Sequence, residues 1–535
     1  MPPLTKKLSD RTATQRVLRI YLFILMSLLL VGGVTFTLAT FHKVFYRFGW
    51  DDDEGAVWWE AAHVTNLHEL YHPIQQYPYF VVPYPPVYHA ITWLAAKGTG
   101  NFLIAGRLIC VFSALGISLL IGLIVLHATP QRIPVRIRGS GALIASLLCF
   151  RLDSLNIYIP EMGVDLLALF FIFLGVYLFL RFSRNTKALY GAFACFVAAV
   201  FTKQTMLAAP LACLAATMLI RPAQGIRYLL FCVALGSAGL GYLAWATGGE
   251  ALRHLFLYNA VEPYILNRLI LGLQANLISM TPIAAVACLS LFSLIDPTLG
   301  KKHVSYLQWL RKKVQSSPNR LAILVLGLEL VIAFLISLTY IKDGSGVHYF
   351  LEWNFVCCPL AGLLLVRVLN HTRAASSYKL GGAAALLLIF LAALTGFPDS
   401  LLRMKNMYHP GASLRQAQDV AYSSNLAALQ VIEQTPGPVL SDNLVLLMQA
   451  HKEISIEPGI QNFLGKAGIW DDSGLTNMIR THQFSVIIIR DLDGGFWTKG
   501  IVQAVHDSYV PVEHIGVDGI GETEDTVYRP SQSGR

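Results

Sequence analysis

Apolar segments of membrane-spanning length recur along most of the chain and are separated by polar connections. A helix needs about 20 apolar residues to cross the hydrocarbon of a bilayer. Eleven segments approach this length, the third and fifth being short: 17–41, 105–126, 139–151, 163–181, 187–202, 204–220, 227–247, 276–295, 321–340, 351–367 and 379–397. The first is too apolar for too long to be a secretory signal and has no small-residue cleavage site, so we expect an uncleaved anchor.

The composition agrees with this pattern and excludes several classes of protein. Hydrophobic residues make up 55% of the chain and charged residues only 14%, and the mean hydropathy is +0.54. A soluble domain carries about 25% charged residues. A soluble enzyme, a disordered chain and a disulfide-rich secreted scaffold are therefore excluded. In a membrane protein, the net charge of +9 is no sign of nucleic-acid binding, and we expect no nucleic-acid partner.

Basic residues alternate between the connections and so predict the orientation. Every second connection is rich in lysine and arginine, with 22 such residues on one side of the membrane against 8 on the other. Short loops rich in these residues stay in the cytoplasm. We therefore predict a multi-pass protein of the cell (inner) membrane, with a cytoplasmic N-terminus and an extracytoplasmic C-terminus.

Two parts of the chain are too polar to lie within the membrane. Residues 42–104 form a long extracytoplasmic loop, with short helices expected at 57–70 and 87–97 and an extended Tyr/Pro-rich stretch at 77–88. Residues 398–535 alternate short apolar runs with polar segments. They predict strands at 438–441, 454–456, 484–489 and 509–515, helices at 444–450, 473–482 and 496–507, and a disordered last dozen residues.

The predicted fold class is a polytopic α-helical membrane protein of about eleven transmembrane helices with a small extracytoplasmic α/β C-terminal domain. Its parts are a cytoplasmic segment with the first helix (1–41), the first extracytoplasmic loop (42–104), the remaining bundle (105–397) and the α/β domain (398–535).

An acidic run, Trp50-Asp-Asp-Asp-Glu-Gly55, stands just after the first apolar segment. Packed carboxylates at a membrane surface can supply a general base, because like charges and partial burial raise the pKa of one member. The alternative is that the acidic run has no catalytic role and is the solvent-exposed beginning of the loop. The run leaves the register open, so the base is one of Asp51, Asp52 and Asp53.

Several short motifs together resemble the GT-C glycosyltransferases, which use polyprenyl-phosphate sugars. Asp53-Glu54-Gly55 followed by Tyr84-Pro-Pro-Val-Tyr88 is similar to the first outer loop of protein O-mannosyltransferases and of the aminoarabinose transferases of lipid A. The motifs Phe201-Thr-Lys-Gln-Thr205 and Gly344-Ser-Gly-Val-His-Tyr-Phe-Leu-Glu352, and the Asp165 that starts a span, resemble later parts of bacterial members. The likeness in layout covers most of residues 17–400.

The resemblance implies an inverting transfer of a hexosyl or pentosyl unit from a polyprenyl-phosphate donor to a hydroxyl of a lipid, glycan or protein. Asp53, with Glu54, would be catalytic. Cations on the outer side would bind the donor phosphate: Lys203, Arg268, Lys342 and His348. The expected substrate-binding residues are Tyr84, Tyr88, Glu161, Asp165 and Glu352. We expect no required cofactor and no metal ligands, and leave a divalent cation open because GT-C members differ in this respect.

Two positions depart from the pattern of the family. The lipid A enzymes carry a lysine where this chain has Tyr84, and an asparagine where it has His348. Phosphate binding must therefore be distributed differently. Lys203 has no acidic residue within four positions, and a cation at the membrane edge is costly without a partner. A donor phosphate or a distant acid would supply one; snorkelling to lipid headgroups is the alternative.

Two other functions compete with glycosyl transfer. A transporter would suit many spans with few charges, but the chain shows no internal repeat and no pair of interrupted helices in corresponding halves. A zinc protease is suggested by His68-Glu-Leu-Tyr-His72, whose spacing on a helix would place two metal ligands on one face. Pro73 ends such a helix at His72, so we expect no zinc and mild effects from replacing either histidine.

Overall fold

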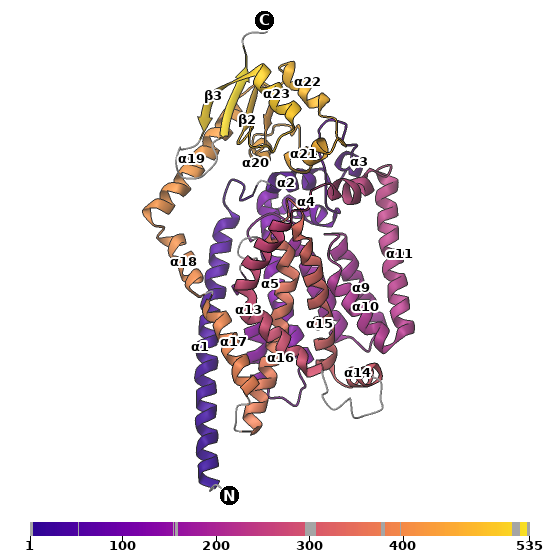
Figure 1. Cartoon of the computed structure of the whole chain (residues 1–535), viewed down its shortest axis with the longest axis vertical. Helices are drawn as coiled ribbons and strands as arrows, with labels where there is room; N and C mark the ends of the chain where they lie inside the picture. The colour runs from indigo at the N-terminus through magenta and orange to yellow at the C-terminus, as the bar shows by residue number, and fades with distance from the viewer. Residues whose placement is uncertain are drawn as a thin grey trace.

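Six helices of the computed structural model are long and apolar enough to cross a membrane. They coincide with α1 (Leu4–Val44), α5 (Phe102–Ala128), α11 (Pro222–Ala246), α13 (Leu266–Leu291), α15 (Pro318–Ser337) and α16 (Leu351–Ala375). This count holds for the residues that the structure describes, 4–51, 53–152, 155, 159–294, 306–375, 380–395, 397–515 and 525–531. The helices run along one common direction (Figure 1), and the chain is a multi-pass membrane protein.

Shorter apolar helices occupy the other predicted segments. They are α6 (Val135–Leu148), α8 (Asp165–Arg181), α9 (Thr186–Val200), α10 (Ala208–Ile220) and α17 (Leu380–Thr395). Each of the eleven predicted segments therefore contains a helix. These five have 13 to 17 residues, fewer than the roughly 20 that span a bilayer, so the number of spans stays a prediction.

Helix α16 forms the centre of the bundle and α11 its edge. Of the most apolar window of each helix, 89% is buried in α16 and 6% in α11, and α11 stands at the margin of the bundle (Figure 1). Small residues let α16 approach α6 closely: a Cβ on Gly362 would lie 2.7 Å from the Cβ of Ala145. This packing holds the middle of α16 against α6, and Glu352 lies at the start of α16.

Residues 42–104 cover one end of the bundle, called here the head end (Figure 1). They contain α2 (Asp53–His63), α3 (Leu67–Leu70) and α4 (Val87–Thr99). The single helix predicted over 57–70 is thus two helices, because Asn66 interrupts it and caps α3 by accepting a hydrogen bond from the Glu69 backbone N–H. The helix predicted over 87–97 is confirmed as α4.

Beyond the head end lies a four-stranded sheet (Figure 1). Its strand order is β1 (Val439–Ser441), β2 (Val486–Ile489), β4 (Asp525–Pro530) and β3 (Tyr509–Ile515). Strands β1 and β2 are parallel, and β4 is antiparallel to both of its neighbours. The helices around the sheet are α20 (Leu444–Gln449), α21 (Pro458–Lys466), α22 (Ser473–Arg480) and α23 (Lys499–Ser508), and α18 (Phe397–Tyr408) and α19 (Ala412–Gln434) lead to it from α17.

The sequence predicted three of these strands, β1, β2 and β3, and missed the fourth. The strand predicted at 454–456 is wrong, since Ile456 makes only an isolated bridge to Tyr79. The expected disorder of the last dozen residues is also wrong for β4, whose Val527 and Tyr528 are buried. These are strand-forming residue types, and the sheet supplies the partners that the local sequence does not reveal.

The extended stretch of the first loop joins this sheet region to the head end. The backbone N–H of Tyr79 donates to the Ser455 carbonyl, and the N–H of Glu457 donates to the Tyr79 carbonyl, both at 2.8 Å. Tyr79 and Val81 share a hydrophobic core with Trp470 and other residues of the C-terminal region. The C-terminal region is therefore packed on the first loop, with Glu457 at the contact.

Candidate active site

Asp53 is the first residue of α2 and is exposed at the head end. Its backbone nitrogen lies 3.5 Å from Oδ1 of Asp51. The start of a helix favours a negative side chain, because the unpaired N–H groups carry partial positive charge. Asp52 lies outside the described residues. The structure thus offers Asp51 and Asp53 as candidate bases, and Asp53 keeps the role that the resemblance gave it as a prediction.

Three buried or half-buried acids surround Asp53. Burial, and next the charge of Asp51, raises the pKa of Glu161 to about 8. Burial, and next the charge of Asp53, raises the pKa of Glu457 to about 8. Burial, followed by Glu457 and Asp53, raises the pKa of Glu60 well above its usual value. Like charges oppose one another, so the negative charges of Asp51 and Asp53 help to raise the pKa of these neighbouring acids.

Glu54, which the sequence suggested as catalytic, lies in a buried ion pair. Its Oε1 accepts from Arg107 Nε at 2.8 Å and from the Met162 backbone N–H at 2.7 Å. Its Oε2 accepts from Arg107 Nη2 at 2.6 Å and from the Trp50 backbone N–H at 2.8 Å. Both charged side chains are at most 1% exposed. We therefore correct the assignment: Glu54 anchors the start of α2 to α5 and so positions Asp53.

We expect Glu54→Gln to destabilise the fold, because removing one partner of a buried ion pair leaves the other charge uncompensated. The cost of such a change is about 3–5 kcal/mol, which should appear as a clear fall in the melting temperature of the purified protein. Glu433→Gln, an exposed change on α19, is the control. Unchanged melting together with a selective loss of kcat would return Glu54 to a catalytic role.

A second charged group forms where α8, the turn after α9 and the start of α16 meet. Lys203 Nζ lies 2.6 Å from Oδ1 of Asp165, and their side chains are 4% and 15% exposed. The ammonium also lies over the rings of Tyr84 and Tyr349, 5.5 and 5.3 Å from their centroids. Lys203 therefore has a partner even without a phosphate, namely Asp165, an acid that is distant in the sequence. The two rings add cation–π attraction that holds the ammonium in place.

A narrow cavity of about 20 Å³ opens beside this ion pair. It is lined by Asp165, Lys203, Thr205, Met206, Ala333, Ile336, His348, Tyr349 and Glu352. Four residues singled out by the sequence, Lys203, His348, Asp165 and Glu352, thus share one cavity. Its volume holds a water-sized group, so entry of a phosphate requires the surrounding side chains to move apart.

Of the two tyrosines expected to bind substrate, Tyr84 lies at this cation and Tyr88 does not. Burial, and next the charge of Asp165, raises the pKa of Tyr84 well above its usual value, so its phenol stays a hydrogen-bond donor. Tyr88 is fully buried, and its hydroxyl donates to the Gly106 carbonyl at 3.1 Å. We correct the expectation for Tyr88, whose hydroxyl joins α4 to α5.

The other two predicted phosphate ligands, Arg268 and Lys342, do not line the cavity. Arg268 Nη1 lies 2.5 Å from Oδ1 of Asp343, and Lys342 pairs with Glu262 and donates to both oxygens of Asn259. These contacts tie the loop before α13 to the loop after α15. The structure thus shows both cations in ion pairs away from the cavity, and their role as phosphate ligands stays a prediction.

The His-Glu-x-x-His motif does not form a metal site. Helix α3 ends at Leu70, and the ring nitrogens of His72 lie 2.7 Å from the Glu69 carbonyl oxygen and 2.5 Å from that of Pro78. Backbone carbonyl oxygens therefore lie within hydrogen-bonding distance of both ring nitrogens of His72. His68 is exposed. Within the described ranges, no group of three or more His, Cys, Asp or Glu side chains is arranged to hold a metal ion.

We expect His68→Ala to be mild and His72→Ala to destabilise the protein, which corrects the sequence-based expectation that both are mild. His72 is buried, and its loss would remove the hydrogen bond that its ring N–H donates to a backbone carbonyl, at a cost of about 1–3 kcal/mol. Thermal unfolding separates the two variants. Metal analysis of the purified wild type should find no stoichiometric zinc; one equivalent of zinc that is lost with His68→Ala would revive the protease hypothesis.

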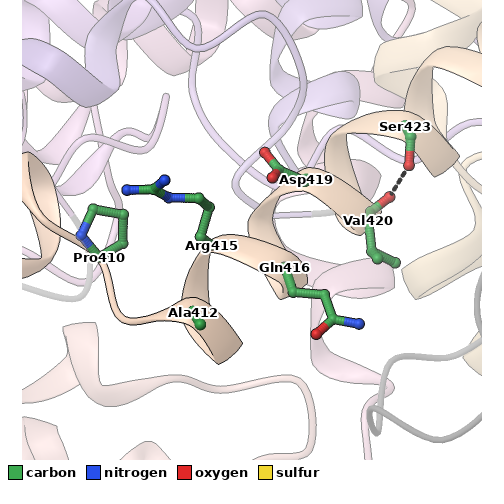
Figure 2. A pocket seen from close by; sticks show the side chains of 7 residues that line it. All are labelled: Pro410, Ala412, Arg415, Gln416, Asp419, Val420 and Ser423. Carbon is green, nitrogen blue, oxygen red and sulfur yellow. Dashed lines mark hydrogen bonds between the residues drawn. The ribbon is translucent and has the colours of Figure 1, made fainter.

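A hollow of about 690 Å³ lies along the start of α19, away from the cavity at Lys203. Figure 2 shows that one helix and the turn before it supply the whole lining, Pro410, Ala412, Arg415, Gln416, Asp419, Val420 and Ser423. None of these side chains is buried. A site needs convergent groups from several elements, so we assign no function to this hollow.

Comparison with known proteins places this geometry in a known fold. No family model and no curated protein sequence matches the chain. The crystal structure of ArnT from Cupriavidus metallidurans bound to undecaprenyl phosphate matches with a TM-score of 0.55 at 12% identity, covering 97% of this chain and 99% of that chain. The chain shares its fold with ArnT. The GT-C fold expected from the sequence is thereby confirmed.

A second solved structure supports the same fold. The oligosaccharyltransferase of Archaeoglobus fulgidus, crystallised with zinc and sulfate, matches with a TM-score of 0.51 at 13% identity, over 96% of this chain and 73% of that chain. At such identities the likeness to both proteins concerns the fold alone. The roles of individual residues rest on the geometry of this chain.

Two features near Asp53 escaped the sequence analysis. Glu457 reaches the head end only because the C-terminal region pairs with Tyr79, and its two oxygens cap α21. His89 Nε2 lies 3.2 Å from Oε2 of Glu60, both side chains being at most 2% exposed, and burial lowers the pKa of His89 to about 3. For Glu60, the sequence offered one signal: it lies two helical turns after Asp53, on the same face of the helix.

Proposed function

We propose that the protein is an inverting glycosyltransferase that moves a hexosyl or pentosyl unit from a polyprenyl phosphate to a hydroxyl group. The observation that carries this proposal is the cavity that gathers Lys203, Asp165, His348 and Glu352, where Tyr84 of the first loop lies against Lys203. The fold shared with ArnT, whose structure holds undecaprenyl phosphate, supports a lipid-phosphate ligand at such a cavity.

In the proposed reaction, Asp53 takes the proton of the acceptor hydroxyl as the oxygen attacks the anomeric carbon. The bond between that carbon and the phosphate oxygen breaks on the opposite side, so the configuration inverts. The electron pair stays with the phosphate, which gains a negative charge. A cation already fixed at this point stabilises the charge without reorganising, and Lys203 is held in that way by Asp165 and the two tyrosines.

Charge balance explains why Lys203 has an acidic partner. The ion pair is neutral before the donor arrives, which avoids a bare cation near the apolar bundle. When the phosphate approaches, the ammonium still has two further N–H donors to offer. Tyr84 and Tyr349 stand on either side as neutral phenols. We propose that these groups take over the role of the lysine that lipid A enzymes carry at position 84.

The proposal includes the side of the membrane and the partners. The head end would face the extracytoplasmic side of the inner membrane, since basic residues concentrate in the connections at the other end. The acceptor would be a lipid, glycan or protein hydroxyl that reaches Asp53 from this side. No metal would be required, because proton transfer and charge stabilisation are both supplied by side chains.

Binding tests the lipid-phosphate part of this proposal. Purified protein in detergent is titrated with undecaprenyl phosphate and, as the matched control, with undecaprenol, which has the same chain and no phosphate. The proposal expects saturable binding and thermal stabilisation by the phosphate alone. Equal effects of the two lipids would contradict a phosphate site. Chelation with EDTA should leave binding and transfer unchanged.

A further inference from the structure

Tyr71 lies inside the His68–His72 motif and makes a contact that the reaction proposed above does not use. It directly follows α3 and is fully buried. Its hydroxyl donates a hydrogen bond to the carbonyl oxygen of Tyr84 at 2.8 Å. Its ring packs edge-on against His254, with the ring centroids 5.7 Å apart. The motif that forms no metal site thus holds the backbone at Tyr84.

The residue next to Lys203 holds the same stretch one residue earlier. Gln204 Nε2 donates to the carbonyl oxygen of Pro83 at 2.9 Å. The same oxygen lies 3.4 Å from Nδ2 of Asn259. The turn that carries the Lys203 ammonium is therefore tied directly to the residue before Tyr84.

Tyr84 has little conformational freedom between these two contacts. The ring of Pro83 fixes its own φ, and Tyr84 is kept out of the helical region because Pro85 follows it. The carbonyl groups of Pro83 and Tyr84 belong to the two peptide planes that flank the Tyr84 Cα, and each accepts a hydrogen bond from a side chain. Holding both planes sets the direction in which the tyrosine side chain leaves the backbone.

We infer that Gln204 and Tyr71 are positioning residues that hold Tyr84 in one orientation. In that orientation the ring lies over the ammonium of Lys203, whose Nζ is 5.5 Å from the ring centroid. This inference rests on the proposed function and deepens it. A ring that is fixed beforehand keeps the ammonium ready for the donor phosphate, whereas a loose ring has to be ordered when the donor binds, which costs affinity.

Two small changes test the inference in the full-length protein purified in detergent. Tyr71→Phe removes only the hydroxyl, and Gln204→Leu removes the amide donor with little change of size. For each we expect affinity for undecaprenyl phosphate to fall about 3- to 10-fold, the effect of one lost hydrogen bond. The kcat/KM for the donor should fall with it, and the acceptor KM should not change. In a Tyr84→Ala background neither change should cause a further loss, because the group through which both act is gone.

Gln461→Leu is the matched control. Gln461 Nε2 also donates to a carbonyl of the first loop, that of Ile74 at 3.2 Å. Its Oε1, like that of Gln204, has no hydrogen-bond partner among the described residues. We expect this variant to lower the melting temperature about as much as Gln204→Leu and to leave phosphate affinity unchanged.

A signal from position 84 reports the orientation of the ring without any ligand. With 3-fluorotyrosine incorporated at position 84, the fluorine resonance should shift or broaden in Gln204→Leu and in Tyr71→Phe. It should stay unchanged in Gln461→Leu, because that bond does not hold the backbone at Tyr84.

The outcomes separate positioning from simple packing. If Gln204→Leu and Tyr71→Phe keep wild-type phosphate affinity, or lose as much in the Tyr84→Ala background as without it, the inference is wrong. If the wild type binds undecaprenyl phosphate no better than undecaprenol, the proposed function fails, and the fluorine spectra decide the inference alone: unchanged resonances in both variants contradict it, and shifted ones support it. Losses of affinity that vanish in the Tyr84→Ala background, together with shifted resonances, support both.

Discussion

Asp53→Asn should lower sugar transfer by about 10²–10⁴-fold, the usual loss when a general base is removed. The asparagine keeps the size of the side chain but cannot take the proton of the acceptor hydroxyl. Since Asp53 is exposed at the start of α2, the melting temperature should stay close to that of the wild type. Initial rates of transfer and a thermal unfolding curve on the same preparation measure both quantities.

Asp51→Asn is the matched control for this prediction, because Asp51 lies two residues away in the same acidic run. We expect a much smaller loss for it. If Asp53→Asn retains near-normal activity while Asp51→Asn is inactive, the base is Asp51 and the register taken from the family is wrong. If both variants remain active, the base has to be sought among Glu161 and Glu457, which have pKa values of about 8.

Lys203→Met should lower kcat/KM for the donor by about 10²–10³-fold, the magnitude found when one preorganised stabiliser of a developing negative charge is removed. The acceptor KM should not change. The single change also leaves Asp165 without its cation, so part of the loss could come from the fold. The double variant Lys203→Met with Asp165→Asn removes both charges and should recover melting temperature but not activity.

Lys203→Arg completes this design, since it keeps the charge while altering the geometry. Partial activity in Lys203→Arg, with little in Lys203→Met, indicates an electrostatic role. Unchanged donor dependence in Lys203→Met would show that the lysine only satisfies Asp165, and the phosphate would then have to be bound elsewhere on the head end.

The sequence predicted the parts of this molecule that depend on local pattern. Apolar length and alternation located the helices and strands β1, β2 and β3. Strand β4 and the split between α2 and α3 at Asn66 were missed, because the first depends on a partner strand and the second on one capping side chain. Tyr88 and Glu54 were placed in the site only because of their positions in the motifs. In the structure, Tyr88 is hydrogen-bonded to Gly106 and Glu54 is ion-paired with Arg107, so both side chains hold the fold together.

The ion pairs show the same limit more sharply. Lys203 has no acid nearby in sequence, yet Asp165 pairs with it because α8 and α9 pack side by side. Residues 259–262 and 342–343 likewise meet through two loops that no periodicity connects. A sequence motif shows which residue types are present. The packing of the helices decides which of the charged residues pair with one another. For this reason Glu457 could not be assigned to the head end beforehand, and the contact between Glu60 and His89 could not be foreseen.

The central claim, sugar transfer from a polyprenyl phosphate at the Asp53 loop, is tested most directly by a transfer assay with purified protein in detergent. Undecaprenyl-phosphate-linked hexoses and pentoses are supplied with lipid, glycan or peptide hydroxyl acceptors, and released undecaprenyl phosphate and glycosylated product are quantified. The account predicts equal amounts of both, an inverted anomeric centre and loss of both in Asp53→Asn. A wild type that releases no undecaprenyl phosphate with any pair would contradict the claim of sugar transfer, and an Asp53→Asn variant as active as the wild type would contradict the assignment of Asp53 as the base.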